Sequence, residues 1–243
     1  MLDLSIVIPA YNEVRKIPRD IRECADFLRA GRLAGEIIVA DDGSTDGTAD
    51  AAEATDAGAG VELRVLRLRH GGKGWAVRNG MMQTRGDYAM FIDSGSCIPL
   101  EDVRPGLEML RRGECEIAHA SRKLPDSVIT IPQPLHRRLF SRMFRLLVML
   151  YLGLPRHLTD TQCGCKMYRG DVARELYGMC RSDGFLFDLE VLMRARARNY
   201  RVKEFPVHWT CDRDSRLKPA RQVAHTISDL IALKRMLRSE AKR

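Results

Sequence analysis

The sequence predicts one α/β domain in which helices cover both faces of a mostly parallel sheet. Short β-branched apolar runs alternate with amphipathic stretches over the first 122 residues, which is the pattern of strands and covering helices in such a sheet. No Pro/Ser-rich linker or internal repeat divides the chain, whose 243 residues are 45% hydrophobic and can bury a sizeable core. Disordered, fibrous and coiled-coil classes are therefore excluded.

The apolar runs are expected to form strands, and the stretches between them are expected to form helices. Each helical stretch opens with turn or capping residues, such as Ser44 or Pro99. The expected strands are 4–9, 36–40, 61–68, 88–92 and 116–120, and the expected helices are 16–30, 46–57, 73–84 and 101–112. The alternation stops near residue 123, where we place a soft boundary.

Polar clusters follow the first, second and fourth of these strands. They are Tyr-Asn-Glu at 11–13, Asp-Asp-Gly-Ser at 41–44 and Asp-Ser-Gly at 93–95. Ligands of parallel sheets bind outside the carboxyl ends of the strands, so the clusters are expected to meet at one edge. They suggest a site for a nucleotide, with or without a bound metal ion. The alternative is that each cluster caps the helix after it, which explains one cluster better than all three.

The net charge of +8 is unevenly distributed along the chain. Residues 1–103 carry 12 basic and 17 acidic groups, whereas residues 104–243 carry 28 basic and 15 acidic groups. The second part is therefore expected to meet an anion. Nucleic acid is excluded because no binding motif occurs and the basic residues are not interleaved with aromatic ones. An anionic membrane surface or a phosphorylated substrate remains.

The chain is expected to lie on a membrane rather than to cross it. No uncharged apolar run reaches the roughly 20 residues that span a bilayer, and the N-terminus lacks the features of a signal peptide. Two amphipathic stretches, 137–151 and 219–243, favour peripheral attachment to the inner (cytoplasmic) face of a membrane. The alternative for 137–151 is that its apolar face packs into the domain. The seven cysteines lack framework spacing and are expected to be reduced thiols.

Six motifs occur in an order that resembles the family 2 glycosyltransferases of the GT-A fold. They read SIVIPAYNE, IIVADDGSTDGT, HGGKGWAVRNGM, FIDSG, DTQCGCKMY and FDLEVL. Within that family, the chain is most similar to the polyprenyl-phosphate (dolichyl-phosphate) glucosyl- and mannosyltransferases. The resemblance implies a glycosyltransferase domain over 1–218, with a nucleotide-sugar-binding half (1–122) and an acceptor-binding half (123–218), followed by a basic amphipathic helix (219–243).

The resemblance also implies the reaction, which is inverting transfer of a hexose from a nucleotide sugar to a polyprenyl phosphate. UDP-glucose is the preferred donor and GDP-mannose the second candidate. A polyprenyl phosphate has a second pKa of about 6, so no strong general base is expected. Two alternatives stay open: transfer to a soluble acceptor, and a nucleotide-sugar-binding protein without turnover.

The residues expected to bind the donor follow from the same motifs. The resemblance places Pro9, Tyr11, Glu13, Asp41 and Asp42 at the base, Lys73 and Arg78 at the diphosphate, and Ser215, Arg216 and Lys218 in a loop that closes over the donor. The glycines around Lys73 precede a helix and suit a phosphate cradle, although a plain turn would use the same residues. A carboxylate at position 41 accepts from uracil or guanine equally, so the base stays open.

The main departure from the family lies at the metal site. The family has Asp-x-Asp after the fourth strand, whereas this chain has Asp93, Ser94 and Gly95. Mg²⁺ or Mn²⁺ is the expected cofactor, because such ions prefer carboxylate and phosphate oxygens. Three interpretations remain: a weaker metal site using Asp93 with waters and Ser96, metal-free stabilisation of the diphosphate by Lys73 or nearby arginines, and a protein that binds but does not transfer.

The remaining site residues are expected on the acceptor side. Besides Asp93 at the metal site, the resemblance gives Arg122, Arg137, Ser141, Asp160, Gln162 and Lys166 as catalytic. The arginines and Ser141 are expected to hold the acceptor phosphate, and Asp160, Gln162 and Lys166 are expected at the interface of sugar and phosphate. Arg138 could take the part of Arg137. Asp188 and Glu190 are placed near the site, with helix caps and ion pairs as the equally weighted alternative.

Overall fold

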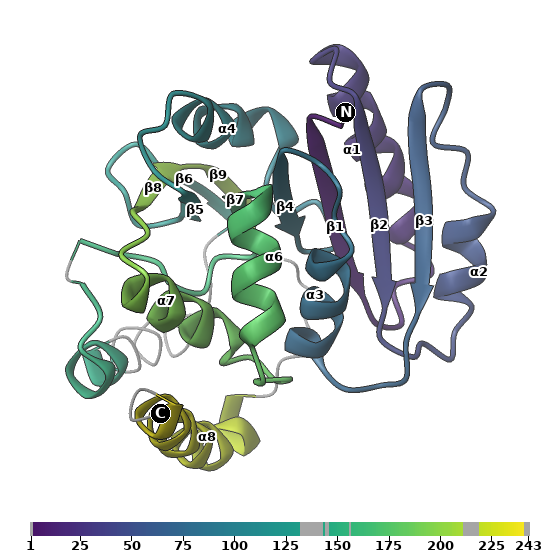
Figure 1. Cartoon of the computed structure of the whole chain (residues 1–243). Helices are drawn as coiled ribbons and strands as arrows, with labels where there is room; N and C mark the ends of the chain where they lie inside the picture. Colours follow the sequence, from purple (N-terminus) through teal and green to yellow (C-terminus); the bar gives the residue numbers. More distant parts are fainter. Residues whose placement is uncertain (1, 132–142, 144–145, 156, 211–218, 241–243) are drawn as a thin grey trace.

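The chain folds around one seven-stranded sheet (Figure 1). The computed structural model describes residues 2–131, 143, 146–155, 157–210 and 219–240. The strands are β1 (Leu4–Ala10), β2 (Gly35–Asp41), β3 (Val61–Arg67), β4 (Tyr88–Ile92), β5 (Ile117–Ser121), β6 (Val128–Ile131), β7 (Cys165–Arg169), β8 (Val202–Pro206) and β9 (His208–Thr210). The helices are α1 (Ile17–Ala30), α2 (Thr48–Glu53), α3 (Lys73–Met82), η1 (Leu100–Val103, a 3₁₀ helix), α4 (Arg104–Arg111), α6 (Gly170–Met179), α7 (Phe187–Ala197) and α8 (Pro219–Glu240).

The sheet is mostly parallel, as the sequence predicts. Its strand order is β3-β2-β1-β4-β7-β5-β8, and β7 alone runs antiparallel to both of its neighbours. A separate pair, β6 and β9, forms a small second sheet. The five strands expected from the apolar runs all form, with bounds that differ by at most one residue. β7 and β8 lie in the part of the chain where the alternation stops, and the sequence did not predict them.

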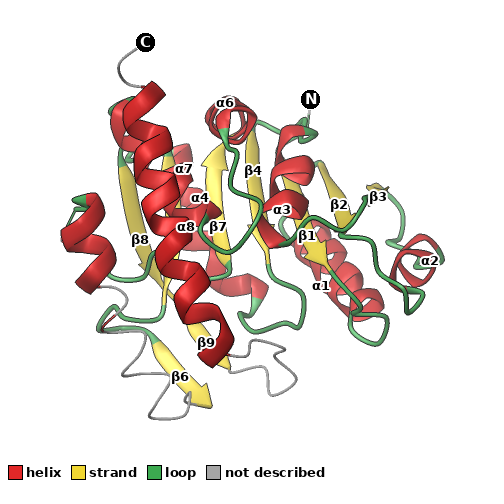
Figure 2. Ribbon diagram, turned by 90° about the horizontal axis from the view of Figure 1, so that it is seen from below, coloured by secondary structure: helices red, strands yellow, loops and turns green. Residues whose placement is uncertain are grey.

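Helices cover both faces of this sheet (Figure 2). On one face, α1 and α4 bury Ile21, Leu28 and Leu107 against the strands. On the other face, α3, α6 and α7 bury residues that include Val77 and Leu176. The central strands β1 and β2 are covered on both sides, which is why they read as continuous apolar runs rather than as alternating ones.

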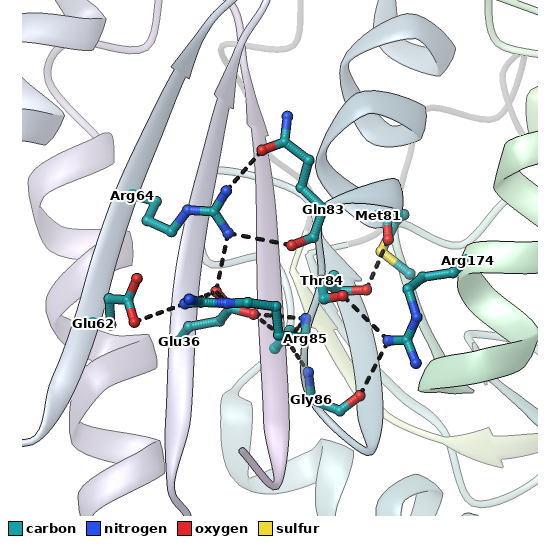
Figure 3. Close-up of polar contacts among 10 residues, drawn as sticks. Glu36, Glu62, Arg64, Met81, Gln83, Thr84, Arg85, Gly86 and Arg174 are labelled. Atoms are coloured by element: carbon teal, nitrogen blue, oxygen red, sulfur yellow. Dashed lines mark hydrogen bonds and ion pairs between the residues drawn. The ribbon is translucent and has the colours of Figure 1, made fainter. Parts of the chain in front are cut away.

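The amino ends of the strands are joined by a buried ion network (Figure 3). Glu36 is fully buried and accepts from Ser5 Oγ (2.7 Å), the Arg85 backbone N–H (2.8 Å) and Arg85 Nη2 (2.6 Å). Arg64 Nη1 contacts the same carboxylate at 3.3 Å, and Glu62 pairs with Arg85 at 2.7 Å. These contacts fix β1, β2, β3 and the turn before β4 at one edge and leave the carboxyl edge for other uses.

A third apolar cluster joins α7, α8 and the helical residues 146–152. Val148 and Leu152 pack there with Leu189 of α7 and with Leu230 and Leu233 of α8. The described part of the stretch 137–151 therefore packs one face, with Val148, into the domain, as the alternative interpretation had it. Met143, Leu146, Leu147 and Leu150 remain exposed on its other face. No helix in the described ranges is long and apolar enough to cross a bilayer.

Candidate active site

The three polar clusters come together at the carboxyl edge of the sheet. β2, β1 and β4 are neighbouring parallel strands, so the residues that follow them emerge side by side. The Asn12 backbone N–H donates to Ser44 Oγ (2.8 Å), and the Thr45 backbone N–H donates to Asn12 Oδ1 (2.8 Å). These bonds join the first two clusters into one surface, which confirms the convergence expected from the sequence.

Asp41 and Tyr11 form the part of this surface that suits a flat heterocycle. Asp41 is 3% exposed, and its Oδ2 accepts from the Ser44 backbone N–H at 3.1 Å. Its Oδ1 is buried and finds no hydrogen-bond partner among the described residues. An unsatisfied buried carboxylate oxygen costs free energy, which a ligand N–H would recover. Tyr11 is stacked on His70 with ring centroids 4.5 Å apart.

Asp42 shapes the glycine loop before α3. Its carboxylate accepts from the backbone N–H groups of Gly71 (2.8 Å) and Gly72 (2.9 Å) and pairs with His70 Nδ1 (2.9 Å). Asp42 therefore positions the loop in this structure, instead of turning its carboxylate toward a donor base as the sequence suggested.

The glycines of the same loop allow a close contact with residues 182–184. A Cβ on Gly72, where φ is +106°, would lie 2.7 Å from the Asp183 carbonyl oxygen. A Cβ on Gly74 would lie 2.5 Å from the Ser182 carbonyl oxygen. The Trp75 backbone N–H donates to the Asp183 carbonyl at 3.0 Å. Close packing of this loop against the backbone of residues 182–184 is thus one reason for these glycines, independent of any bound phosphate.

Lys73 and Asp93 face each other at the centre of the site. Lys73 Nζ donates to Asp93 Oδ2 at 2.8 Å. Burial disfavours the charge on Lys73, but the carboxylates of Asp93 and Asp188 outweigh it and raise its pKa. Asp93 Oδ1 is buried and without a hydrogen-bond partner in the described part of the chain. The pair therefore presents a permanent cation beside an unsatisfied carboxylate oxygen.

Gly164 is the closest neighbour of Asp93. The Asp93 backbone N–H donates to the Gly164 carbonyl at 2.8 Å. A Cβ at position 164 would lie only 2.0 Å from Asp93 Oδ2. The glycine of the motif at 160–166 is therefore required by the space that the carboxylate occupies.

Arg122, which follows β5, and Asp160 form a second ion pair. Arg122 Nε and Nη2 donate to the two oxygens of Asp160 at 2.6 and 2.8 Å. The guanidinium also lies over the Trp209 ring, 5.3 Å from its centroid. Burial alone would raise the pKa of Asp160, but Arg122 outweighs it and holds that pKa well below its usual range. The backbone N–H groups of Thr159 and Asp160 donate to Glu204, which fixes this loop on β8.

Lys166 lies in the interior, not at the surface of the site. It is fully buried, and its Nζ donates to Asp188 Oδ1 (2.7 Å) and to the Cys163 carbonyl (2.8 Å). Burial raises the pKa of Asp188, against the opposing effect of Lys166. This position differs from the direct sugar contact expected from the sequence, because the strand β7 turns the lysine toward α7.

Arg78 and Glu190 both hold the segment 180–183. Arg78 donates to the Cys180 carbonyl (2.8 Å) and pairs with Asp183 (2.8 Å), so its guanidinium is committed to the protein. Glu190 accepts from the Ser182 backbone N–H (2.7 Å) and pairs with Arg194 (2.7 Å). For Glu190 these are the caps and ion pairs of the alternative interpretation. For Arg78 they differ from the expected diphosphate contact.

The other expected site residues divide into two groups. Pro9 is half-buried one residue before the end of β1 and is paired in register with Ala40. Glu13 pairs with Lys16 at 3.2 Å, and Gln162 is half-buried in the loop before β7. Arg137, Ser141, Ser215, Arg216 and Lys218 lie outside the described residues.

Two contributors were missed from the sequence. Asp20, on α1, binds the loop 94–96, and Trp209, on β9, covers Arg122. Neither position carries a sequence signal, because an acid inside a helix and an aromatic in a short strand are ordinary residues.

Asp93 can supply one ligand to a divalent ion. No group of three or more His, Cys, Asp or Glu side chains suited to a metal occurs in the residues that the structure describes. The unsatisfied Asp93 Oδ1 nevertheless fits an Mg²⁺ or Mn²⁺ ion that takes its other ligands from a diphosphate and water, as Mg²⁺ commonly does.

Comparison with known proteins identifies the family. Residues 5–177 match the family described as Glycosyl transferase family 2. The chain belongs to glycosyl transferase family 2. It is therefore a glycosyltransferase, and the order of motifs that indicated this family from the sequence is confirmed.

Curated relatives carry related names. A dolichyl-phosphate beta-glucosyltransferase of Drosophila melanogaster is 33% identical over 231 residues, which are 90% of this chain and 70% of that protein. A protein of the same name from Dictyostelium discoideum is 27% identical over 95% of this chain and 73% of its own length. Glycosyltransferase AglD of Haloferax volcanii is 31% identical over 91% of this chain, which spans only 35% of AglD.

Solved structures confirm the GT-A fold. Glucosyl-3-phosphoglycerate synthase of Mycobacterium tuberculosis, in complex with Mn²⁺, UDP-glucose and phosphoglyceric acid, superposes with a TM-score of 0.66. The match covers 96% of this chain and 78% of that one at 22% sequence identity, so it bears on the fold alone.

Proposed function

We propose that this glycosyltransferase moves a hexose from a nucleotide sugar to a polyprenyl phosphate, with UDP-glucose as the donor and GDP-mannose as the second candidate. The observation that carries the proposal is the Lys73–Asp93 pair at the carboxyl edge, next to the unsatisfied oxygen of Asp41. The names of the dolichyl-phosphate beta-glucosyltransferases support the acceptor class and the sugar.

The donor would lie across the ends of β1, β2 and β4. Asp41 Oδ1 would accept an N–H of the base, and Tyr11, Pro9 and Glu13 would line the same pocket. Lys73 would face the diphosphate, because its raised pKa keeps it charged at all physiological pH values. Ser215, Arg216 and Lys218 would close over the donor from the segment after β9.

Asp93 Oδ1 would hold a Mg²⁺ or Mn²⁺ ion together with the donor diphosphate. Such an ion, when bound, neutralises charge on the leaving diphosphate. Lys73 would supply a second positive charge at the same place. By acting on the diphosphate directly, this charge would offset the absence of the second carboxylate of the family's Asp-x-Asp motif.

Arg122 would position the acceptor phosphate. Asp160 engages its Nε and Nη2, and no other side chain in the described part of the protein accepts from Nη1. Nη1 would donate to a phosphate oxygen, while Trp209 lies against the guanidinium plane. Arg137, Ser141 and Gln162 would complete this side. The phosphate is already ionised near pH 7 and attacks the anomeric carbon directly, so positioning and charge neutralisation supply the catalysis.

Transfer of radiolabelled sugar tests the proposal. The enzyme is incubated in detergent with a polyprenyl phosphate, either UDP-glucose or GDP-mannose, and Mg²⁺, Mn²⁺ or EDTA. Lipid-linked product is expected from UDP-glucose, and Asp93→Asn should abolish it. Asp87→Asn is the matched control, because Asp87 is exposed at the opposite end of β4.

Each outcome of that assay has a consequence. Product lost in EDTA would support the metal held by Asp93, and product surviving EDTA would assign charge neutralisation to Lys73 alone. Donor binding without lipid-linked product would overturn the acceptor assignment and favour a soluble acceptor or a binding protein.

We also propose peripheral attachment to an anionic membrane on its cytoplasmic face. A groove of about 1020 Å³ lies between residues 150–153, α6, α7 and α8. Its walls include Leu150, Tyr151, Met179, Met193 and Leu237, and its basic side chains are Arg181, Arg194, Arg196, Arg198, Lys234 and Arg238, against a single acid, Glu240. Apolar walls with a basic excess suit lipid headgroups and the adjoining acyl chains.

A further inference from the structure

Asp20 of α1 binds each of the three residues that follow Asp93. Asp20 is 5% exposed, and its Oδ2 accepts from Ser94 Oγ (2.6 Å) and from the Gly95 backbone N–H (2.9 Å). Its Oδ1 accepts from Ser96 Oγ at 3.1 Å. One carboxylate in a helix thus anchors three consecutive residues more than 70 positions away.

The loop is held in a conformation that it would not adopt unaided. Gly95 has φ +110°, and Ser96, which is not a glycine, has φ +49°. A non-glycine residue in the left-handed region costs free energy and persists only where its surroundings fix it. Asp20 supplies that constraint, and Glu23, one turn further along α1, is a second carboxylate acceptor that shares the single hydroxyl proton of Ser96 with Asp20.

Asp93 is therefore clamped from both sides. Its own backbone N–H is bound by the Gly164 carbonyl, and the residues after it are bound by Asp20. The direction of its carboxylate toward Lys73 depends on both anchors.

We propose that Asp20 is a positioning residue for the transfer reaction. It touches neither donor nor acceptor and acts by fixing the backbone on the C-terminal side of Asp93, so that the single carboxylate of this site keeps one orientation. The inference rests on the proposed function, in which Asp93 meets the donor diphosphate. A purely structural alternative is that Asp20 only stabilises the contact between α1 and the loop.

Asp20→Asn tests the proposal, with Asp26→Asn as the matched control. Asp26 is on the same helix and loses the same charge, but its side chain is 73% exposed and, among the described residues, bonds only to Arg29. We expect Asp20→Asn to lower kcat by about 10- to 100-fold, the range seen when outer partners of metal ligands are removed. The KM for the acceptor and the activity of Asp26→Asn should stay within about twofold of the wild-type values.

Hydrogen exchange separates this result from a failure of the proposed function. In the ligand-free protein, Asp20→Asn should speed exchange at the amides of residues 93–97, while the core strands β1 and β2 stay protected. Mn²⁺-dependent UDP binding, measured by calorimetry, should weaken in parallel even if the acceptor is wrong. Ser94→Ala, which removes one of the bonds, should show a smaller loss of both. Unchanged exchange, UDP binding and kcat in a folded Asp20→Asn protein would overturn the proposal, as would a loss that follows global unfolding alone.

Discussion

The contact between Gly164 and Asp93 makes a prediction at the scale of single residues. In Gly164→Ala the new methyl group would stand 2.0 Å from Asp93 Oδ2, so the carboxylate must move away from Lys73. Because a displacement of about 1 Å can cost about 10²-fold in rate, we expect a loss of that order in kcat. Steady-state kinetics and circular dichroism measure the loss and the fold together.

Gly178→Ala is the matched control for this substitution. No atom lies within 4 Å of a Cβ at position 178, and alanine favours the helix α6 in which it stands. Full activity in Gly164→Ala would show that the orientation of Asp93 is not needed for transfer.

Gly95→Asp restores the family's Asp-x-Asp motif, yet we expect it to lower activity. The backbone at position 95 has φ +110°, where a residue with a Cβ is strained, and its N–H is bonded to the carboxylate of Asp20. A new carboxylate there would also lie close to a like charge. Thermal denaturation should show a lower Tm, and the transfer assay should show no gain with Mn²⁺. A gain in metal-dependent activity would contradict the geometry of this loop.

At the residue scale, the sequence predicted where the site residues lie relative to the sheet, but it did not predict which residues they bond to. Asp41, Lys73 and Asp93 could be placed because each follows or begins an element whose end the sequence marks. The partners of Lys166 and Arg78 come from α7 and from segment 180–183, and no local pattern records such long-range contacts.

The exposed apolar face beside the groove gives a prediction at the scale of an element. Leu150 is 74% exposed on the helical residues 146–152, whose opposite face is packed in the core. Leu150→Glu should reduce severalfold the amount of protein that floats with anionic vesicles, because it would place a charge at the boundary between the lipid headgroups and the acyl chains. The Tm should stay unchanged. Met82→Glu, at an exposed apolar position of α3, is the control and should float like the wild type. Equal flotation of both variants would exclude this face as the lipid contact.

The elements of the first half could be predicted because each carries its own pattern. Parallel strands buried on both faces give apolar runs, and amphipathic helices separate them. β7 differs, because Lys166 interrupts its short apolar pattern and its pairing partners, β4 and β5, precede it by more than 40 residues. The motif that includes β7 was interpreted as a set of catalytic residues, although the strand itself is part of the core.

The ion network at the amino edge predicts how the stability of the whole molecule depends on pH. Burial alone would raise the pKa of Glu36, but its bonds from Arg85 and Ser5 lower that pKa below the usual value. The stabilisation is therefore present above the unfolded-state pKa of about 4.3 and is lost as the pH falls through the lower folded-state pKa. Glu36→Gln should cost about 3 kcal/mol at pH 7, and the difference in Tm from the wild type should shrink in acid.

Glu62→Gln is the control for this network. Glu62 pairs with the same Arg85 but is 49% exposed, so its loss should cost less than about 1 kcal/mol. Denaturant unfolding measures both variants at pH 7 and at a pH of about 3, which is well below the unfolded-state pKa of about 4.3. A constant difference between Glu36→Gln and the wild type at the two pH values would show that ionisation of Glu36 does not matter.

The antiparallel strand β7 determines how the two parts of the enzyme depend on each other. β7 is inserted between β4, which is followed by Asp93, and β5, which is followed by Arg122. The segments that carry Asp93 and Arg122 are therefore joined by backbone hydrogen bonds of one shared strand. A chain cut near residue 122 would leave β4 with a bare edge open to pairing with other chains. A replacement for the residues after 122 would therefore have to keep β7 in register with both of its neighbours, and could not be attached as a separate module.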